Sequence, residues 1–270
     1  MKSISRRTFV VHSAHASIGV SAGLAAVDWN RAWGDEASPA AGGDSPRAAD
    51  AKRLNLCLVS GSLEYKSDAS LASFEEYVQR RYPIRCHRAF IRTEEDLPGL
   101  EQLDRADCML LFTRRLRLPA SQVDRVKAYC RRGGAIIGLR TASHAFQTWL
   151  ALDKEVFGGD YGGHYGDRDK PRIAAAAAGG EHPILRGVTP FVSSGSLYKN
   201  AQIAADTTVL LTGSIPGHDE PVAWTRQHRG GRVFYTSLGH PDDFRQSSFL
   251  NLVVNAIFWT TRRPVQRLSS

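Results

Sequence analysis

The sequence is short of cysteine, with four in 270 residues, and none of the four stands in a C-x-x-C or similar ligand spacing. A cysteine-bound metal or a redox pair is therefore not expected. Three of these residues lie in apolar segments, which favours small buried core positions, although an even number in an exported protein leaves a disulfide bridge open. We predict that no cysteine takes part in chemistry. The four are Cys57, Cys86, Cys108 and Cys130.

The chain also has no internal repeat and no run apolar enough to span a membrane. The longest mildly apolar stretch, residues 10–27, is interrupted by His12 and His15. Lysine and arginine exceed aspartate and glutamate by 35 to 27, giving a net charge of +8. Many of the basic residues gather in 114–132 without interleaved aromatics or a binding motif, which favours a solvated helix face over a nucleic-acid surface. We predict no nucleic-acid partner and no membrane span, and leave the oligomeric state open.

The amino terminus is typical of an export signal. Ser5-Arg6-Arg7-Thr8-Phe9-Val10 matches the twin-arginine pattern, and a weak apolar segment follows it. Residues 28–50 are rich in Ala, Gly, Ser, Pro and Asp, as in a disordered linker. We expect residues 1–50 to be a twin-arginine signal peptide and linker, and the protein to be periplasmic or secreted. A chance arginine pair on a cytoplasmic protein is the alternative.

Beyond residue 50, short apolar runs alternate with helical periodicity, which predicts an α/β fold with a mostly parallel sheet and helices on both faces. In the second half, short strands between glycine turns predict antiparallel additions, and residues 174–178 suit either a helix or a short strand. We expect one domain over 51–263 and a tail over 264–270. Strands are predicted at 54–59, 84–90, 108–112, 135–139, 209–212, 221–225 and 232–238, and helices at 68–81, 119–133 and 247–260.

The segment 133–146 carries the most information about function. An apolar strand runs into a sharp turn at Arg140 and then, we predict, into a helix that begins near His144. Hydrolases and amidotransferases place Ser or Cys at such a turn, whereas a guanidinium has only donors and stays protonated. Acyl transfer is therefore not expected. A cationic fork beside His144 suits hydroxyls, a carboxylate or a developing oxyanion, and a buried salt bridge of Arg140 is the alternative.

Further candidates follow other strand ends and loops. The glycine-rich loop 157–166 carries Tyr161 and His164, and His240 stands where a late strand ends. Asp243 suits a helix cap or a ligand to a sugar hydroxyl. Each histidine has a structural alternative, as a hydrogen-bonded core or turn residue.

Four separated motifs carry a family resemblance: the elbow at 133–146, His182-Pro183-Ile184, Pro221-Val222-Ala223-Trp224-Thr225, and the strand end at 230–240. In this order they resemble the ThuA-like (trehalose-utilisation) family, whose domain is similar to class I glutamine amidotransferases. The resemblance covers about Leu54 to Trp259. It implies a flavodoxin-like sheet and a role with disaccharides or their oxidised derivatives.

Two positions depart from the family pattern. The family commonly has His where this chain has Arg140, and an acidic pair where it has Gly195-Ser196 before Leu197-Tyr198. Because an imidazole and a carboxylate are natural metal ligands, we predict no metal site or other cofactor from the residues, and a divalent metal stays open only through the resemblance. Seven residues remain as the predicted site: catalytic Arg140, His144 and His240, and substrate-binding Tyr161, His164, Tyr198 and Asp243.

Because Arg140, His144 and His240 follow strand ends, we expect them to meet His164 and Tyr198 at the carboxyl edge of the parallel strands. Two functions are compatible with such a site. One is a sugar-modifying enzyme that acts on disaccharides, keto-sugars or glycosides by acid/base chemistry, in an isomerisation or elimination. The other is a non-catalytic carbohydrate-binding or scaffold protein that keeps the fold.

Overall fold

The computed structural model describes residues 53–200 and 202–269, so the predicted export signal and linker lie outside the described residues. Within this part, nine strands form one sheet and three α-helices accompany it. The elements are β1 (Leu54–Gly61), α1 (Ser67–Arg81), β2 (Ile84–Phe90), β3 (Cys108–Thr113), α2 (Ala120–Arg131), β4 (Ala135–Leu139), β5 (Arg172–Ala175), β6 (Phe191–Val192), β7 (Thr208–Ile215), β8 (His218–His228), β9 (Gly231–Thr236) and α3 (Ser247–Thr260).

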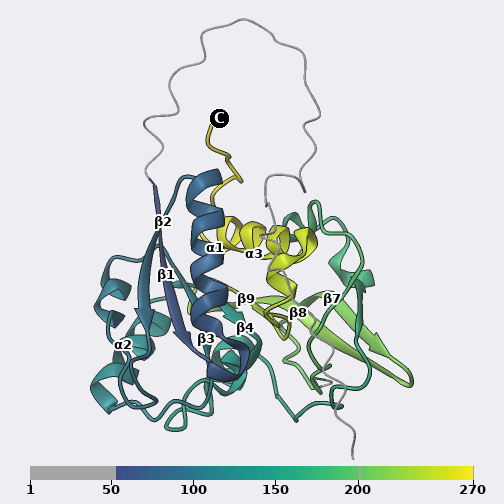
Figure 1. The fold of residues 1–270 in the computed structure, drawn as a ribbon, viewed down its shortest axis with the longest axis horizontal. Helices are drawn as coiled ribbons and strands as arrows, with labels where there is room; N and C mark the ends of the chain where they lie inside the picture. Colours follow the sequence, from purple (N-terminus) through teal and green to yellow (C-terminus); the bar gives the residue numbers. More distant parts are fainter. Residues whose placement is uncertain (1–52, 201, 270) are drawn as a thin grey trace, which may run out of the picture. The chain divides into compact units, whose positions relative to one another are not determined.

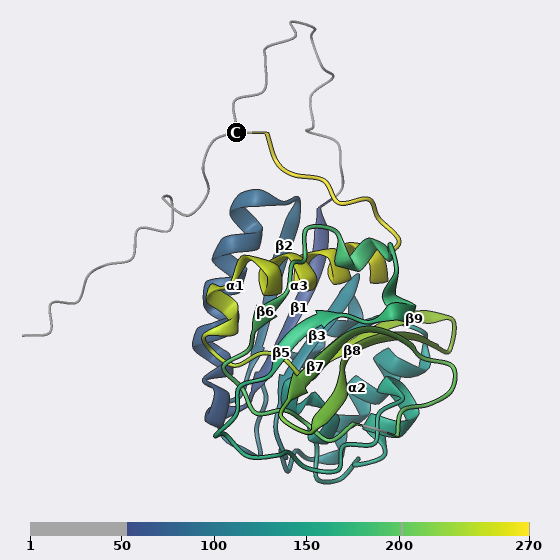
Figure 2. The same cartoon turned by 90° about the vertical axis from the view of Figure 1, so that its right-hand side faces the viewer.

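The sheet has a parallel half and an antiparallel half (Figure 1). The strand order is β2-β1-β3-β4-β9-β8-β7-β5-β6, and all pairs from β2 to β9 are parallel. This parallel order is that of flavodoxin-like sheets, as predicted. From β8 onward each pairing is antiparallel, and Figure 2 looks onto this side, with β7 and β8 in front of β1 and β3. The predicted antiparallel additions are therefore confirmed.

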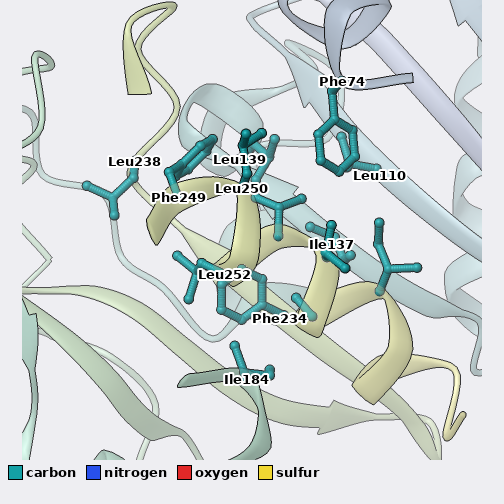
Figure 3. Close-up of a cluster of buried hydrophobic side chains, with 14 of the residues drawn as sticks. Phe74, Leu110, Ile137, Leu139, Ile184, Phe234, Leu238, Phe249, Leu250 and Leu252 are labelled. Atoms are coloured by element: carbon teal, nitrogen blue, oxygen red, sulfur yellow. The ribbon is translucent and has the colours of Figure 1, made fainter. Parts of the chain in front are cut away.

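Helices cover both faces of the parallel strands, so the sheet has a core on each face. The strand residues alternate between these two cores. Leu110 and Phe112 of β3 pack in the cluster that includes α1 and α3, where Phe74 and Phe249 join them (Figure 3). Met109 of β3, one position along, belongs to the cluster under α2. Side chains one residue apart in a strand point to opposite faces, so a continuous apolar run serves both cores.

The predicted helix after the elbow is wrong. Arg140–His144 forms a single 3-10 turn, and the chain then leaves helical geometry. The carbonyl oxygens of His144 and Ala145 accept the backbone N–H groups of Arg115 and Leu116, both at 2.8 Å, and are thereby lost to a helix. Tertiary pairing with the loop after β3 therefore overrides the local propensity.

The second half differs in detail from the expected pattern. The ambiguous segment 174–178 ends the edge strand β5 and begins a 3-10 turn, Ala177–Gly179. β8 runs for 11 residues, more than twice the predicted strand. In the predicted tail, the Leu268 N–H donates to the Arg81 carbonyl at the end of α1. Within the described ranges, no helix is long and apolar enough to cross a membrane.

All four cysteines are free thiols. Burial raises the pKa of Cys57, Cys108 and Cys130 to about 12, and burial also raises the pKa of Cys86. A thiol is nucleophilic as its thiolate, so these cysteines are unreactive near neutral pH. That none takes part in chemistry stays a prediction.

Candidate functional site

The turn after β4 is a strained elbow. Arg140 has a φ of 45°, in the left-handed region that non-glycine residues rarely adopt. The Tyr235 hydroxyl donates to the Arg140 carbonyl at 2.7 Å and holds the peptide in place. The predicted sharp turn is thus present, and it directs the Arg140 side chain back across the carboxyl edge of the sheet.

The Arg140 guanidinium is buried among neutral acceptors. Its side chain is 1% exposed, and its terminal nitrogens donate to the Ser237 carbonyl at 2.8 Å, the Tyr65 hydroxyl at 3.0 Å and the Ser196 hydroxyl at 3.1 Å. Its central carbon lies 4.3 Å from the Tyr65 ring centroid and 4.7 Å from that of Tyr198. No carboxylate of the described residues forms an ion pair with it, so the buried salt bridge is not what holds it.

Two aromatic residues pack with His144 beside this cation. The His144 ring stacks on Tyr161 at 4.5 Å between centroids, and Tyr161 lies 4.6 Å from Tyr198. Burial, with the charges of Arg115, Arg114 and Arg140, lowers the pKa of His144 to about 3. The imidazole is therefore neutral at physiological pH. It suits a hydrogen-bonding role and is a weak base.

Tyr65 belongs to this site, although the sequence analysis did not select it. It lies in the 3-10 turn Leu63–Tyr65 after β1. Its hydroxyl accepts from Arg140, and its ring meets that of His240 edge-on at 6.4 Å between centroids. The signal in the sequence is only its place in the first loop after a parallel strand, where ligands commonly bind.

His240 follows β9 and faces Tyr65. Its side chain is 31% exposed, and its Nδ1 accepts the Asp242 N–H at 3.2 Å. Asp243 lies behind it and is completely buried. The Asp243 carboxylate accepts four hydrogen bonds of 2.9 to 3.1 Å, from Ser193 Oγ and from the N–H groups of Ser194, Gly239 and His240. With these bonds Asp243 holds two loops together. Its buried carboxylate is not placed to contact a ligand, contrary to our prediction.

His164 contacts this group through its backbone. Its backbone pairs with Tyr198 in an antiparallel bridge, but the side chain is exposed and its Nδ1 accepts the Gly166 N–H at 3.1 Å. Directly opposed residues of such a pair project to the same face, so His164 lies at the rim on the side of Tyr198. The structure therefore brings Arg140, His144, Tyr161 and Tyr198 together, joins His240 to them through Tyr65, and leaves His164 outside.

The residues at the elbow do not fit a metal ion. The Arg140 guanidinium fills the space beside Gly195, where an added Cβ would lie 2.6 Å from its Nη1. The neighbouring Ser196 offers its oxygens to that cation at 3.1 and 3.4 Å. In residues 53–200 and 202–269, no group of three or more His, Cys, Asp or Glu is placed to hold a metal ion.

Known structures share this fold at low sequence identity. A ThuA-like protein from Bacteroides uniformis ATCC 8492 superposes with a TM-score of 0.62 at 18% identity, over 81% of this chain and 95% of that one. A ThuA-like protein from Parabacteroides merdae ATCC 43184 gives 0.63 at 14%, over 80% and 93%. The β-galactosidase of Rahnella sp. R3 gives 0.54 at 12%, over 79% of this chain but 32% of the enzyme. These matches establish the fold.

A search of curated proteins gives no match. The family model described as ThuA, trehalose utilisation, matches residues 61–260, which include β3, the elbow, the glycine-rich loop and His240. This match spans well over half of the chain and agrees with the motifs and the strand order. The chain belongs to the ThuA family.

Proposed function

We propose that this ThuA-family protein binds a disaccharide, a glycoside or a keto derivative of either at the carboxyl edge of its parallel strands, and moves a proton at the carbon next to a carbonyl. The observation that carries the proposal is the buried Arg140 guanidinium, which has no ion pair among the described residues and donates to the Tyr65 hydroxyl. A fixed positive charge behind a hydroxyl stabilises negative charge that develops on a carbonyl oxygen. Glutamine amidotransfer is not proposed, because Arg140 cannot act as a nucleophile.

The proposed step uses two neighbouring side chains, His240 and Tyr65, whose ring centroids lie 6.4 Å apart. Nδ1 of His240 carries the basic lone pair when it accepts the Asp242 N–H, so in the proposed step it exchanges that hydrogen bond for the substrate and removes the proton from the carbon beside the carbonyl. The Tyr65 hydroxyl donates to the oxygen that becomes an enolate.

Return of the proton from His240 to the former carbonyl carbon, while the hydroxyl proton of the neighbouring carbon passes to the enolate oxygen, gives an isomer. If the enolate instead re-forms the carbonyl and expels the alkoxide on the next carbon, which takes the proton from His240, the result is elimination. Arg140 acts through Tyr65, and neutral His144 and Tyr161 form a wall that binds the sugar by stacking and hydrogen bonds.

One observation favours the second function, carbohydrate binding without catalysis. The Arg140 terminal nitrogens are all engaged with Ser196, Ser237 and Tyr65, and no base among the described residues lies within hydrogen-bond distance of the guanidinium. Aromatic walls alone are sufficient for a sugar-binding protein. Turnover therefore has to be measured separately from binding.

Replacing Tyr65 with Phe tests the enzyme. This change keeps the ring that covers Arg140 but removes the hydroxyl, so we expect kcat to fall about 100-fold with little change in KM. The purified protein is screened against disaccharides and their keto derivatives, and product formation is followed with time. Tyr77→Phe, on α1 and away from the site, serves as the control. Binding without turnover in the unaltered protein favours the second function, and equal turnover by Tyr65→Phe overturns the proposed role of Tyr65.

We also propose that the protein is exported by the twin-arginine route. Recognition of the signal reads both guanidinium groups, so replacing Arg6 and Arg7 with Lys is expected to leave the precursor inside the cell. Fractionation with immunodetection measures this, and a single exchange of Lys2 to Arg, outside the motif, serves as the control. Arrival of the double variant in the periplasm or medium would show that the motif is not a twin-arginine export signal.

A further inference from the structure

Three basic residues have left-handed backbone at the carboxyl edge of the sheet. Lys66, Arg115 and Arg140 have φ angles of 45°, 49° and 45°, and they lie in the connections that follow β1, β3 and β4. These three strands are neighbours in the sheet. Non-glycine residues rarely adopt this conformation, and where it persists it marks functional sites more often than chance would place it there.

The backbone around Arg115 is fixed on both sides. The N–H of Arg114 donates to the carbonyl of Gly61 at the end of β1, at 3.0 Å, and the N–H of Arg115 donates to the carbonyl of His144 at 2.8 Å. The loop after β3 is thereby tied to the end of β1 and to the elbow. The backbone of Arg115 is therefore held beside the elbow.

These positive charges are poorly compensated. Arg114 forms an ion pair with Glu64 at 2.7 Å, but within the described ranges neither Lys66 nor Arg115 forms one, and both are exposed. Arg140 adds a buried cation at the same edge of the sheet. The depressed pKa of His144, caused by burial and then by Arg115, Arg114 and Arg140, is consistent with an excess of positive charge here.

The topology puts this charge where a ligand enters. After β1 the chain continues through α1 to β2, and after β3 it continues through α2 to β4 on the other side and the opposite face. The connections therefore part between β1 and β3, and open α/β sheets bind ligands in the crevice at such a point. Lys66 and Arg115 belong to the two connections that flank it.

We propose that the sugar bound here carries an anionic group, a carboxylate or a phosphate, and that Arg115 and Lys66 contact that group. This inference rests on the proposed function and names the substrate class of the same site. The planar guanidinium of Arg115 matches two oxygens of either anion, while Lys66 supplies a point charge. Neutral disaccharides would meet only the wall of His144 and Tyr161 together with Tyr65 and His240.

Calorimetric titration of the full chain with matched sugars tests the inference. Lactobionate is compared with lactose for the carboxylate, trehalose 6-phosphate with trehalose for the phosphate, and keto-trehalose tests the site itself. We expect the charged member of one pair to bind at least about ten-fold more tightly, and this advantage to shrink when the salt is raised to about 0.5 M. The pair that responds identifies the anion. Arg115→Gln and Lys66→Gln are each expected to weaken only the charged sugar, by about five-fold.

Arg131→Gln removes an exposed charge at the far end of α2 and is expected to change none of these affinities. If lactose and trehalose bind as tightly as their charged counterparts or more tightly, the inference is wrong and the proposed function stands. If keto-trehalose binds and all four other sugars fail, the inference is again wrong. If no sugar binds at all, the proposed function fails with it. Unchanged affinity in both Arg115→Gln and Lys66→Gln removes these residues as the contacts.

Discussion

Replacing Asp243 with Ala is expected to lower the free energy of unfolding by about 4 kcal/mol, because four donors lose a charged acceptor inside the protein. The carboxylate is completely buried, so water does not replace it without opening the loops. The chain over Ser193–Gly195 and the turn at Gly239–His240 would separate. Chemical denaturation followed by tryptophan fluorescence measures the change.

Asp242 offers a matched control one residue away. It is 49% exposed, forms a surface ion pair with Arg245 at 3.1 Å, and has a carboxylate oxygen 3.4 Å from His240 Nδ1. Exposed pairs of this kind contribute below about 1 kcal/mol, so Asp242→Ala is expected to be nearly neutral. Equal stability of the two variants would contradict the holding role of Asp243. Asp243→Asn, which keeps one acceptor oxygen, is expected to fall between them.

Replacing Asp153 with Asn is expected to stabilise the protein at pH 7 and to remove a pH dependence. Burial, opposed by the Tyr161 N–H and reinforced by Asp160, raises the pKa of Asp153 from 3.8 to about 6. The folded state therefore holds the proton more firmly than the unfolded state, and stability falls as the pH rises from about 4 to 6. By pH 7 the ionised carboxylate costs about 3 kcal/mol, from roughly 1.4 kcal/mol per pKa unit.

A neutral amide at this position would avoid the cost and still accept the Tyr161 N–H, which now donates to the Asp153 carboxylate at 2.9 Å. Unfolding free energies of the unaltered protein and of Asp153→Asn are compared between pH 4 and pH 8. We expect similar values near pH 4, a gap that widens between about pH 4 and pH 6, and a constant gap above about pH 7. Asp124→Asn, exposed on α2, controls for the loss of a negative charge. A gap that is constant over this range would rule out Asp153 as its source.

The sequence was sufficient for the parallel half of the fold because its local and global signals agree there. Each apolar run became a strand and each periodic segment between them a helix, and α3 has the predicted bounds, Ser247–Thr260. The prediction of a helix after the elbow is wrong because the carbonyls of His144 and Ala145 accept hydrogen bonds from the distant loop that follows β3. No window of sequence around Arg140 contains that information.

The sequence predicts site residues that follow strand ends. It does not reveal residues whose role is to hold other side chains or loops in place. The sequence predicted Arg140, His144 and His240 from their positions after strand ends, and the fold brings Tyr161 into contact with His144 and Tyr198 into contact with Arg140. Tyr65 lies in a short turn without periodicity, so its hydrogen bond to Arg140 is visible only in three dimensions. Asp243 has the sequence context of a helix cap, and burial gives it four donors instead of one.

The contact between Gly195 and Arg140 limits which substitutions the two positions tolerate. Because an added Cβ at position 195 would lie 2.6 Å from Nη1 and 2.8 Å from the central carbon of the guanidinium, any larger residue there excludes this arginine rotamer. Glycine without the arginine is sterically harmless, whereas the arginine without the glycine is not. A substitution at Gly195 is therefore expected to require a change at Arg140 as well, while Arg140 can be exchanged with Gly195 in place.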